Sequence, residues 1–265
     1  MTPQSRRVVS KEPKNHGLHR AFKYATKTEL VFSNPTDRTE RPKCEKYVAS
    51  FYNKDEIAQL FELFKGDRME LCVHIAAYYG LRRSEVVGLK WDAVDFQQKT
   101  LTIKHKVIDD YIDGKEVIIA EDKLKNASSR RTLPLIPHIE KLLLEEKQKQ
   151  EYYMDLLKDG YNMEYKDYIC RDNFGNLITP AFVSDHFRFM IRKHGMRKIR
   201  FHDLRHSCAS LLLANGIQMK QIQDCWDTPL TTSQLIFTAI LITAQSWSRQ
   251  PLCHRYLDNF LDFFR

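Results

Sequence analysis

The spacing of hydrophobic positions predicts a mainly helical chain that is interrupted by a short run of strands. In several segments the apolar residues recur at intervals of three and four, which places them on one face of an α-helix. The predicted helices are residues 18–31, 53–65, 69–79, 84–90, 137–159 and 181–194, and a last helix that starts near residue 202 and stops before Gly216. The start of the second helix is the best marked, because Asn53 and Glu56 have the spacing of a capping box.

The strand signals lie in the middle of the chain. Residues 101–108 alternate between apolar and polar side chains, a turn follows at Asp113-Gly114, and residues 116–120 can pair back. Residues 130–135 are the third predicted strand, and residues 167–180 resemble a shorter strand pair. We therefore expect an α+β fold, mainly helical, with a small three-stranded antiparallel sheet.

Composition and charge narrow the class of partner. The net charge of +8 and the pI of about 9.1 favour a polyanion such as nucleic acid, although many other proteins are also basic. The six cysteines are widely spaced with no C-x-x-C pair, so a reduced, cytoplasmic protein is the simpler interpretation. The sequence contains no signal peptide and no apolar run of 18 residues, so no membrane span is expected.

The densest candidate chemistry lies in residues 200–216. Arg200, His202, Arg205 and His206 cluster at the start of a helix, and the last three share one face at positions i, i+3 and i+4. Arginine offers a planar fork of donors that suits phosphate. A core helix with a solvated, charged end would produce the same pattern.

A second candidate arginine, Arg82, lies at a junction between a loop and a helix. Backbone N–H groups at such a junction can help to bind a phosphate. Arg83 beside it is expected to be solvated. Glu85 could support Arg82, or could simply be a favourable charge in the first helical turn.

A basic run leads into the central cluster, where the backbone of a nucleic acid would approach. A solvated patch is the alternative. The residues are Arg188, Arg192, Lys193, Arg197, Lys198 and Arg200. Zinc is not expected, because no glutamate follows His202 in the manner of a zincin helix and no third ligand is evident.

Three segments together resemble the tyrosine recombinases, or phage integrases, of conjugative transposons and prophages. HDLRH at 202–206 resembles the H-x-L-R-H box of this family. GLRRSEVVGLKW at 80–91 resembles its first-arginine box, and KLKNASSRRTLPL at 123–135 resembles its hairpin-lysine segment. The boxes occur in the family's order, within a resemblance that runs from about residue 24 to residue 224.

The resemblance implies an enzyme that cuts and rejoins DNA strands. In the family, a tyrosine attacks the scissile phosphate and forms a 3′-phosphotyrosyl link. By resemblance Arg82, His202 and Arg205 are catalytic, and Lys125 is the general acid, with Lys123 as the alternative. Double-stranded DNA is the implied partner, intact members assemble as tetramers on it, and no metal or cofactor is implied.

The resemblance also implies a domain organisation. Residues 1–46 would be a remnant of the family's core-binding domain plus a linker, which implies a truncated N-terminus. Residues 47–224 would be the catalytic domain. Residues 225–265 would be an aberrant tail, because the family pattern breaks off after residue 224.

The break removes the expected nucleophile. Thr228 stands near an expected histidine, and Phe237 stands near the expected tyrosine. The codons for residues 224–247 can also be translated in a shifted frame, which joins the last base of each codon to the first two bases of the next. In this frame the codons around Cys225 and Trp226 must encode Leu-Leu-Gly. The next codon in the shifted frame can encode histidine, and the codon ten positions later can encode tyrosine. We interpret the tail as an out-of-frame translation; a divergent, unrelated C-terminus is the alternative.

Two functions follow from the sequence. The first is a recombinase domain that is inactive because the nucleophile is missing. The second is a DNA-binding protein without chemistry, such as a competitor of an intact integrase.

Overall fold

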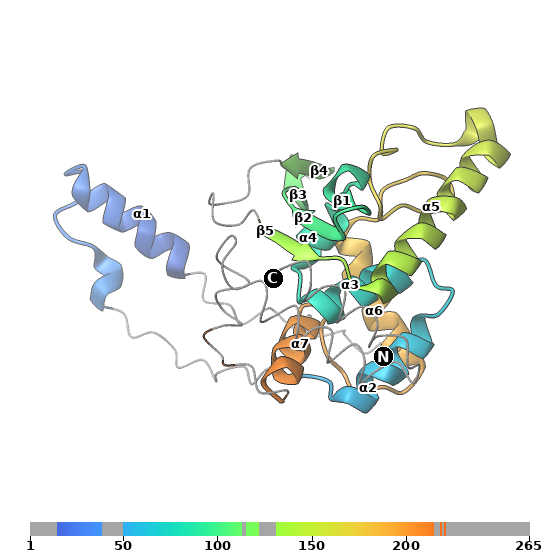
Figure 1. Ribbon diagram of the computed structural model, residues 1–265. Helices are drawn as coiled ribbons and strands as arrows, with labels where there is room; N and C mark the ends of the chain where they lie inside the picture. Colours follow the sequence, from blue (N-terminus) through green and yellow to red (C-terminus); the bar gives the residue numbers. More distant parts are fainter. Residues whose placement is uncertain are drawn as a thin grey trace, which may run out of the picture. The chain divides into compact units, whose positions relative to one another are not determined.

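The computed structural model describes residues 15–38, 50–112, 115–121 and 131–214, together with residues 218 and 220. These residues fall into two compact units that divide between Val48 and Ala49. In the first unit, helix α1 (Asn15–Lys27) is followed by the short 3-10 helix η1 (Pro35–Arg38) (Figure 1). The side chains of His19 and Thr36 connect them through a hydrogen bond of 3.0 Å.

The second unit is built around helix α3 (Glu70–Tyr79), in which every residue from 71 to 79 is buried. Helix α3 packs against α2 (Lys54–Phe64), α4 (Arg83–Val87), α5 (Pro137–Leu157) and α7 (Asp203–Ala214) (Figure 1). A helix that is apolar on all sides needs partners on all sides, so this surrounding of α3 follows from its sequence. Gly80 ends α3 in the left-handed conformation, with φ of 61°.

The predicted helix starts are confirmed where the signals were local. Asn53 caps α2 and forms the complete capping box with Glu56. The remaining elements of the second unit are the 3-10 helices η2 (Trp91–Ala93) and η4 (Lys158–Gly160) and helix α6 (Pro180–Lys193), which Thr179 caps.

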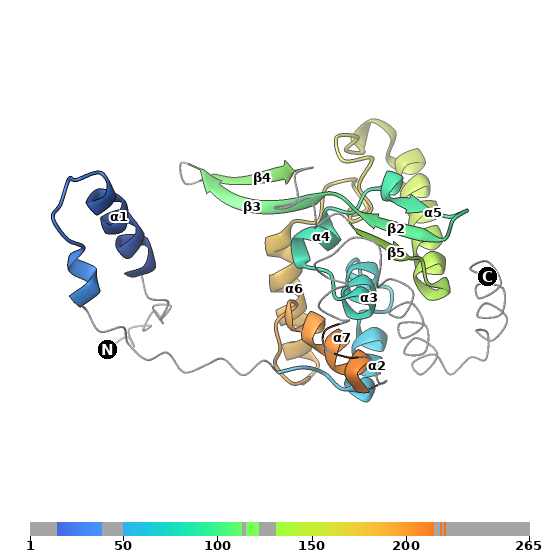
Figure 2. The same ribbon diagram turned by 60° about the vertical axis from the view of Figure 1, so that its left-hand side comes forward.

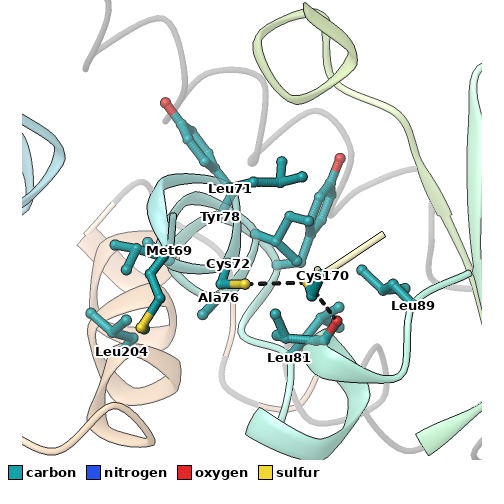
Figure 3. Close-up of a cluster of buried hydrophobic side chains, with 14 of the residues drawn as sticks. Met69, Leu71, Cys72, Ala76, Tyr78, Leu81, Leu89, Cys170 and Leu204 are labelled. Carbon is teal, nitrogen blue, oxygen red and sulfur yellow. Dashed lines mark hydrogen bonds between the residues drawn. The ribbon is translucent and has the colours of Figure 1, made fainter. Parts of the chain in front are cut away.

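Side chains from distant segments meet on the surface of α3 (Figure 3). Met69 lies beside Leu204 of α7, and Cys72 faces Cys170 with 3.2 Å between the two sulfur atoms. Cys170 also contacts the carbonyl oxygen of Val86 at 3.4 Å. Both cysteines are free and buried, and the hydrogen bond with Cys72, together with burial, raises the pKa of the Cys170 thiol.

The strands form two antiparallel pieces. A three-stranded sheet has the order β1 (Val94–Asp95), β2 (Thr100–Ile103), β5 (Arg131–Pro134). A separate hairpin consists of β3 (Lys106–Ile112) and β4 (Lys115–Glu121), and Figure 2 shows it projecting from the body of the unit.

The expected α+β class and the three-stranded sheet are therefore present, but the strand partners differ from the prediction. The predicted strand 101–108 is interrupted at residues 104–105, and its two halves belong to different sheets. Gly88, which directly follows α4, lets the chain pass close to the start of β3 at this break. A Cβ atom at Gly88 would lie only 2.7 Å from the Cα atom of Lys106. The predicted strand pair at 167–180 is reduced to a single bridge between Arg171 and Leu177.

His74 lies in the core, on the otherwise apolar helix α3. It is 4% exposed, its Nδ1 lies 2.9 Å from Nε2 of His138, and its ring stacks on Phe61. Burial, and then the neighbouring His138, lower the pKa of His74 to about 3. The side chain is therefore neutral at pH values well above 3.

We expect His74 to make the protein less stable in mild acid, by about 2 kcal/mol between pH 7 and pH 5. An unfolded histidine binds a proton near pH 6.5, whereas the native His74 stays neutral down to about pH 3. The contribution of this residue to stability is therefore lost as the pH falls. Urea unfolding at pH 7 and pH 5 measures the free energy of unfolding, and the loss between the two should be smaller in His74→Phe than in the wild type. The matched control is His194→Gln, which replaces an exposed histidine. An unchanged difference in the phenylalanine variant would contradict the assignment.

Within the described part of the chain, no helix has the length and apolar character needed to cross a bilayer.

Candidate active site

Arg82 is positioned by the junction between α3 and α4. The left-handed Gly80 turns the chain out of α3, and Arg82 is the last residue before α4. The backbone N–H of Arg82 donates to Glu85 Oε2 and its guanidinium donates to Glu85 Oε1, both at 3.0 Å. Its side chain is still 46% exposed, so the guanidinium can also meet a ligand from solvent.

Glu85 is the buried centre of the site. Its side chain is 3% exposed and also accepts from Arg131, whose Nη2 lies 2.7 Å from Oε2. Burial alone would raise the pKa of Glu85, but the hydrogen bond and charge of Arg131, with those of Arg82, hold it below its usual value. Of the two roles considered for Glu85 in the sequence, the structure therefore supports the buttress of Arg82.

Arg205 reaches the same place from α7. Its Nη1 donates to the carbonyl oxygen of Gly80 at 2.7 Å, only two residues before Arg82. Burial, and then the positive charge of Arg82, lower the pKa of Arg205 to about 10. Arg205 remains protonated at neutral pH, so the positive charges of Arg82 and Arg205 lie in the same space beside Gly80 and repel each other. An anion in that space would relieve the repulsion.

His202 and His206 stand beside Arg205 at the start of α7. Both side chains are exposed, and their rings meet edge to face with centroids 6.0 Å apart. Partial burial, and then the charge of Arg205, lower the pKa of His202. His202 is therefore neutral at pH 7 and can donate one hydrogen bond from its ring.

The predicted basic run is exposed, but its members differ in what they contact. Arg200 forms an ion pair of 2.8 Å with the fully buried Asp203, the first residue of α7, and its backbone N–H donates to the same carboxylate. Arg197 donates to Glu56 of α2 at 2.7 Å, so it also ties the segment before α7 to the core. Arg200 and Arg197 thus have structural contacts in addition to any ligand.

The other members of the run lie on or after α6. Arg188 pairs with Asp185 one turn earlier at 3.3 Å, and the ammonium of Lys193 lies 5.9 Å from the ring centroid of Phe189. Arg192 and Lys198 are exposed.

Three predicted positions lie outside the described residues. They are Lys125, its alternative Lys123, and Phe237 at the expected nucleophile position. The end of the lysine segment is nevertheless anchored, because β5 begins at Arg131 and pairs with β2 through Ile103.

Arg83 and Arg131 have structural roles that the sequence analysis did not assign. Arg83 was expected to be solvated, but its guanidinium donates to Ser184 of α6 and lies 3.4 Å from Asp109 of β3. Arg131 and Leu133 lie on the buried face of β5 and alternate with the less buried Thr132 and Pro134. A charged residue in an inward position of a strand requires a charged or polar partner, and this signal could have identified Arg131.

Metal binding was also considered. Among the residues that the structure describes, no group of three or more histidine, cysteine or acidic side chains is close enough to hold an ion. His202 and His206 therefore have no third ligand of these types within the described segments.

Residues 50–227 match the phage integrase family. The chain belongs to this family, and the match ends three residues after the position at which the recognisable pattern stops.

Curated relatives agree with this assignment. The chain is 27% identical over 224 residues to the tyrosine recombinase XerC-like protein of Caldanaerobacter subterraneus subsp. tengcongensis, covering 79% of this chain and 56% of the relative. It is 26% identical over 206 residues to the ICEBs1 integrase of Bacillus subtilis, covering 75% and 52%. The chain thus spans about half the length of these relatives.

Solved structures show the same fold. The Tn1549 transposon integrase, solved in complex with a circular intermediate DNA, superposes with a TM-score of 0.65 at 15% identity, covering 95% of this chain and 79% of that chain. The lambda integrase, solved as a tetramer bound to a Holliday junction, gives a TM-score of 0.54 at 17% identity, covering 83% and 58%.

Proposed function

We propose that this chain is a site-specific DNA recombinase domain that binds double-stranded DNA but cannot transfer strands. The observation that carries the proposal is the convergence of Arg82 and Arg205, from boxes far apart in sequence, beside the buried carboxylate of Glu85. Related proteins solved with DNA support the same partner. Assembly as a tetramer on DNA is proposed for intact members.

The charge of the site around Arg82 and Arg205 suits a phosphodiester. Arg82, Arg131 and Arg205 carry three positive charges, and Glu85 neutralises one of them. Burial of Arg205, and then the nearby charge of Arg82, lower the pKa of Arg205 to about 10, so an anion at this position would be favourable. Phosphate oxygens placed between Arg82 and Arg205 would be bound by charge-assisted hydrogen bonds, which are stronger than neutral ones.

The proposed roles follow from this placement. Arg82 and Arg205 would hold the non-bridging oxygens and stabilise the charge that develops on them. The neutral ring of His202 would donate a further hydrogen bond. Lys125, or Lys123 in its place, would protonate the leaving 5′-hydroxyl. His206 and the exposed basic run would contact the DNA backbone without reading sequence.

The reaction is proposed to stop there because no residue can attack the phosphate. No tyrosine occurs between Tyr168 and Tyr256, and Phe237 near the expected position has no hydroxyl group. The family match ends at residue 227, close to the forced Leu-Leu-Gly of the alternative register. Both observations support a lost nucleotide rather than gradual divergence.

The coding DNA across residues 220–247 tests the origin of the tail. The proposal expects the alternative frame to encode Leu-Leu-Gly-His followed by tyrosine ten positions later. A frame with tyrosine in place of the histidine, or with no tyrosine at the second position, rules out the lost nucleotide. The tail would then be a divergent end.

The biochemical test uses the chain as it stands and a nicked duplex. We expect binding that weakens steeply with salt, as phosphate contacts require, and no covalent adduct between protein and DNA. An adduct would refute the missing-nucleophile argument. Absence of any salt-dependent binding would refute the DNA-binding proposal itself. Arg82→Gln is expected to weaken binding, whereas the exposed Lys141→Gln on α5 is the matched control.

A further inference from the structure

Arg131 is a buried cation to which none of the binding or catalytic roles proposed above has been assigned. Its side chain is 2% exposed, and its guanidinium makes two contacts with Glu85, from Nη2 to Oε2 at 2.7 Å and from Nη1 to Oε1 at 3.4 Å. Burying such a pair is costly, and pairs of this kind are often no more stabilising than apolar side chains of similar size. A reason other than stability is therefore worth seeking.

The same two carboxylate oxygens hold Arg82. Oε1 accepts from the Arg82 guanidinium and Oε2 accepts from the Arg82 backbone N–H, each at 3.0 Å. Each oxygen of Glu85 thus receives one donor from Arg82 and one from Arg131. A carboxylate with four donors in fixed directions has a single orientation, and that orientation determines where the Arg82 guanidinium points.

The backbone of Arg131 is itself fixed. Arg131 is the first residue of β5 and pairs with Ile103 in the sheet. It also directly follows the segment that contains Lys123 and Lys125. The sheet therefore fixes Arg131, Arg131 orients Glu85, and Glu85 orients Arg82.

We propose that Arg131 is a positioning residue, which sets the Arg82 guanidinium for the anion through the buried carboxylate of Glu85. The inference rests on the proposed function, because it assumes that Arg82 binds a phosphate. Arg131 itself does not touch the ligand. If Arg131 served stability alone, its removal would weaken the fold without changing the geometry of Arg82.

The test is a double-mutant cycle on DNA binding by the full chain. Arg82→Gln and Arg131→Met should each weaken binding to a duplex by roughly tenfold. Each should also reduce the salt slope by about 0.9, the value for one lost phosphate contact. The double variant should bind no more weakly than either single variant, because both changes remove the same contact. Additive losses, or an unchanged salt slope in Arg131→Met, would overturn the proposal.

A second readout does not depend on DNA. The NMR signal of the Arg82 Nε–Hε group, assigned by its loss in Arg82→Gln, should shift in Arg131→Met and stay unchanged in Lys141→Met, which removes an exposed ion-paired lysine. If the wild-type chain does not bind DNA, the proposed function fails, and this signal still decides the inference. An unmoved Arg82 signal in Arg131→Met would overturn it.

Arg131→Lys covers the case in which the methionine variant does not fold. Lysine retains the charge but lacks the planar fork that contacts both carboxylate oxygens. We expect a smaller shift of the Arg82 signal and a partial loss of duplex affinity, at a urea midpoint close to that of the wild type. Full wild-type binding with an unmoved Arg82 signal would show that orientation by the fork is not needed, and would overturn the proposal.

Discussion

Replacing Glu85 with alanine is expected to lower the free energy of unfolding by about 3–5 kcal/mol, the range for breaking a buried ion pair by removing one partner. The substitution removes the carboxylate that lies among Arg82, Arg131 and Arg205. Three positive charges would then share a mostly buried space. Urea unfolding of the wild type and the variant measures the loss.

The control for this result is an exposed carboxylate in a similar local setting. Glu62 on α2 faces Lys65 at 4.0 Å, with both side chains largely exposed. Glu62→Ala should change stability by no more than about 0.5 kcal/mol, since exposed pairs contribute little. A Glu85→Ala variant as stable as Glu62→Ala would show that the described network does not hold the site together.

Restoring the reading frame is expected to convert a chain that forms no covalent adduct into one that does. The register described for residues 224–247 is the one that a single inserted nucleotide before codon 225 would recover. If the insertion returns a tyrosine ten positions after the histidine, a nucleophile is again available to the site formed by Arg82 and Arg205. A nicked duplex that traps the phosphotyrosyl product measures the gain on a denaturing gel.

Two variants make this result specific. Phe237→Tyr adds a hydroxyl group near the expected position but leaves the rest of the tail out of frame, so we expect no adduct. Arg205→Gln in the frame-restored chain should abolish most of the gain, because it removes a contact that stabilises developing charge, an effect of about 10²–10³-fold for one such donor. An adduct that survives Arg205→Gln undiminished would mean that the tyrosine reacts outside this site.

The parts of the fold that depend on local signals could be predicted. The apolar spacing placed α2, α3 and α5 to α7 within a few residues of their observed bounds. The capping box at Asn53 and the end of α3 at residue 79 were also predicted correctly, because each depends on residues within one turn. Arg82 and Arg205 were identified by the resemblance of their boxes, and the structure brings both to Gly80.

The parts that depend on distant partners could not be predicted in the same way. The polar run Lys104-His105-Lys106 interrupts the alternation of residues 101–108, but nothing local shows that the two halves pair with different strands. The charge of Arg131 is balanced by Glu85, 46 positions earlier. Arg83 contacts Ser184, 101 positions later. Periodicity predicts which face of an element is buried, but it does not identify the partner.

The hydrogen bond between Arg205 and the Gly80 carbonyl has a consequence for the growing chain on the ribosome. The two residues are 125 positions apart, so Arg82, Glu85 and Arg131 are all synthesised well before α7 emerges. Until then, the face of α3 that later receives Leu204 and Cys208 has no cover. A nascent chain that stalls before residue 203 therefore exposes apolar surface and lacks the second arginine. It is a target for chaperones and proteases rather than a partly working domain.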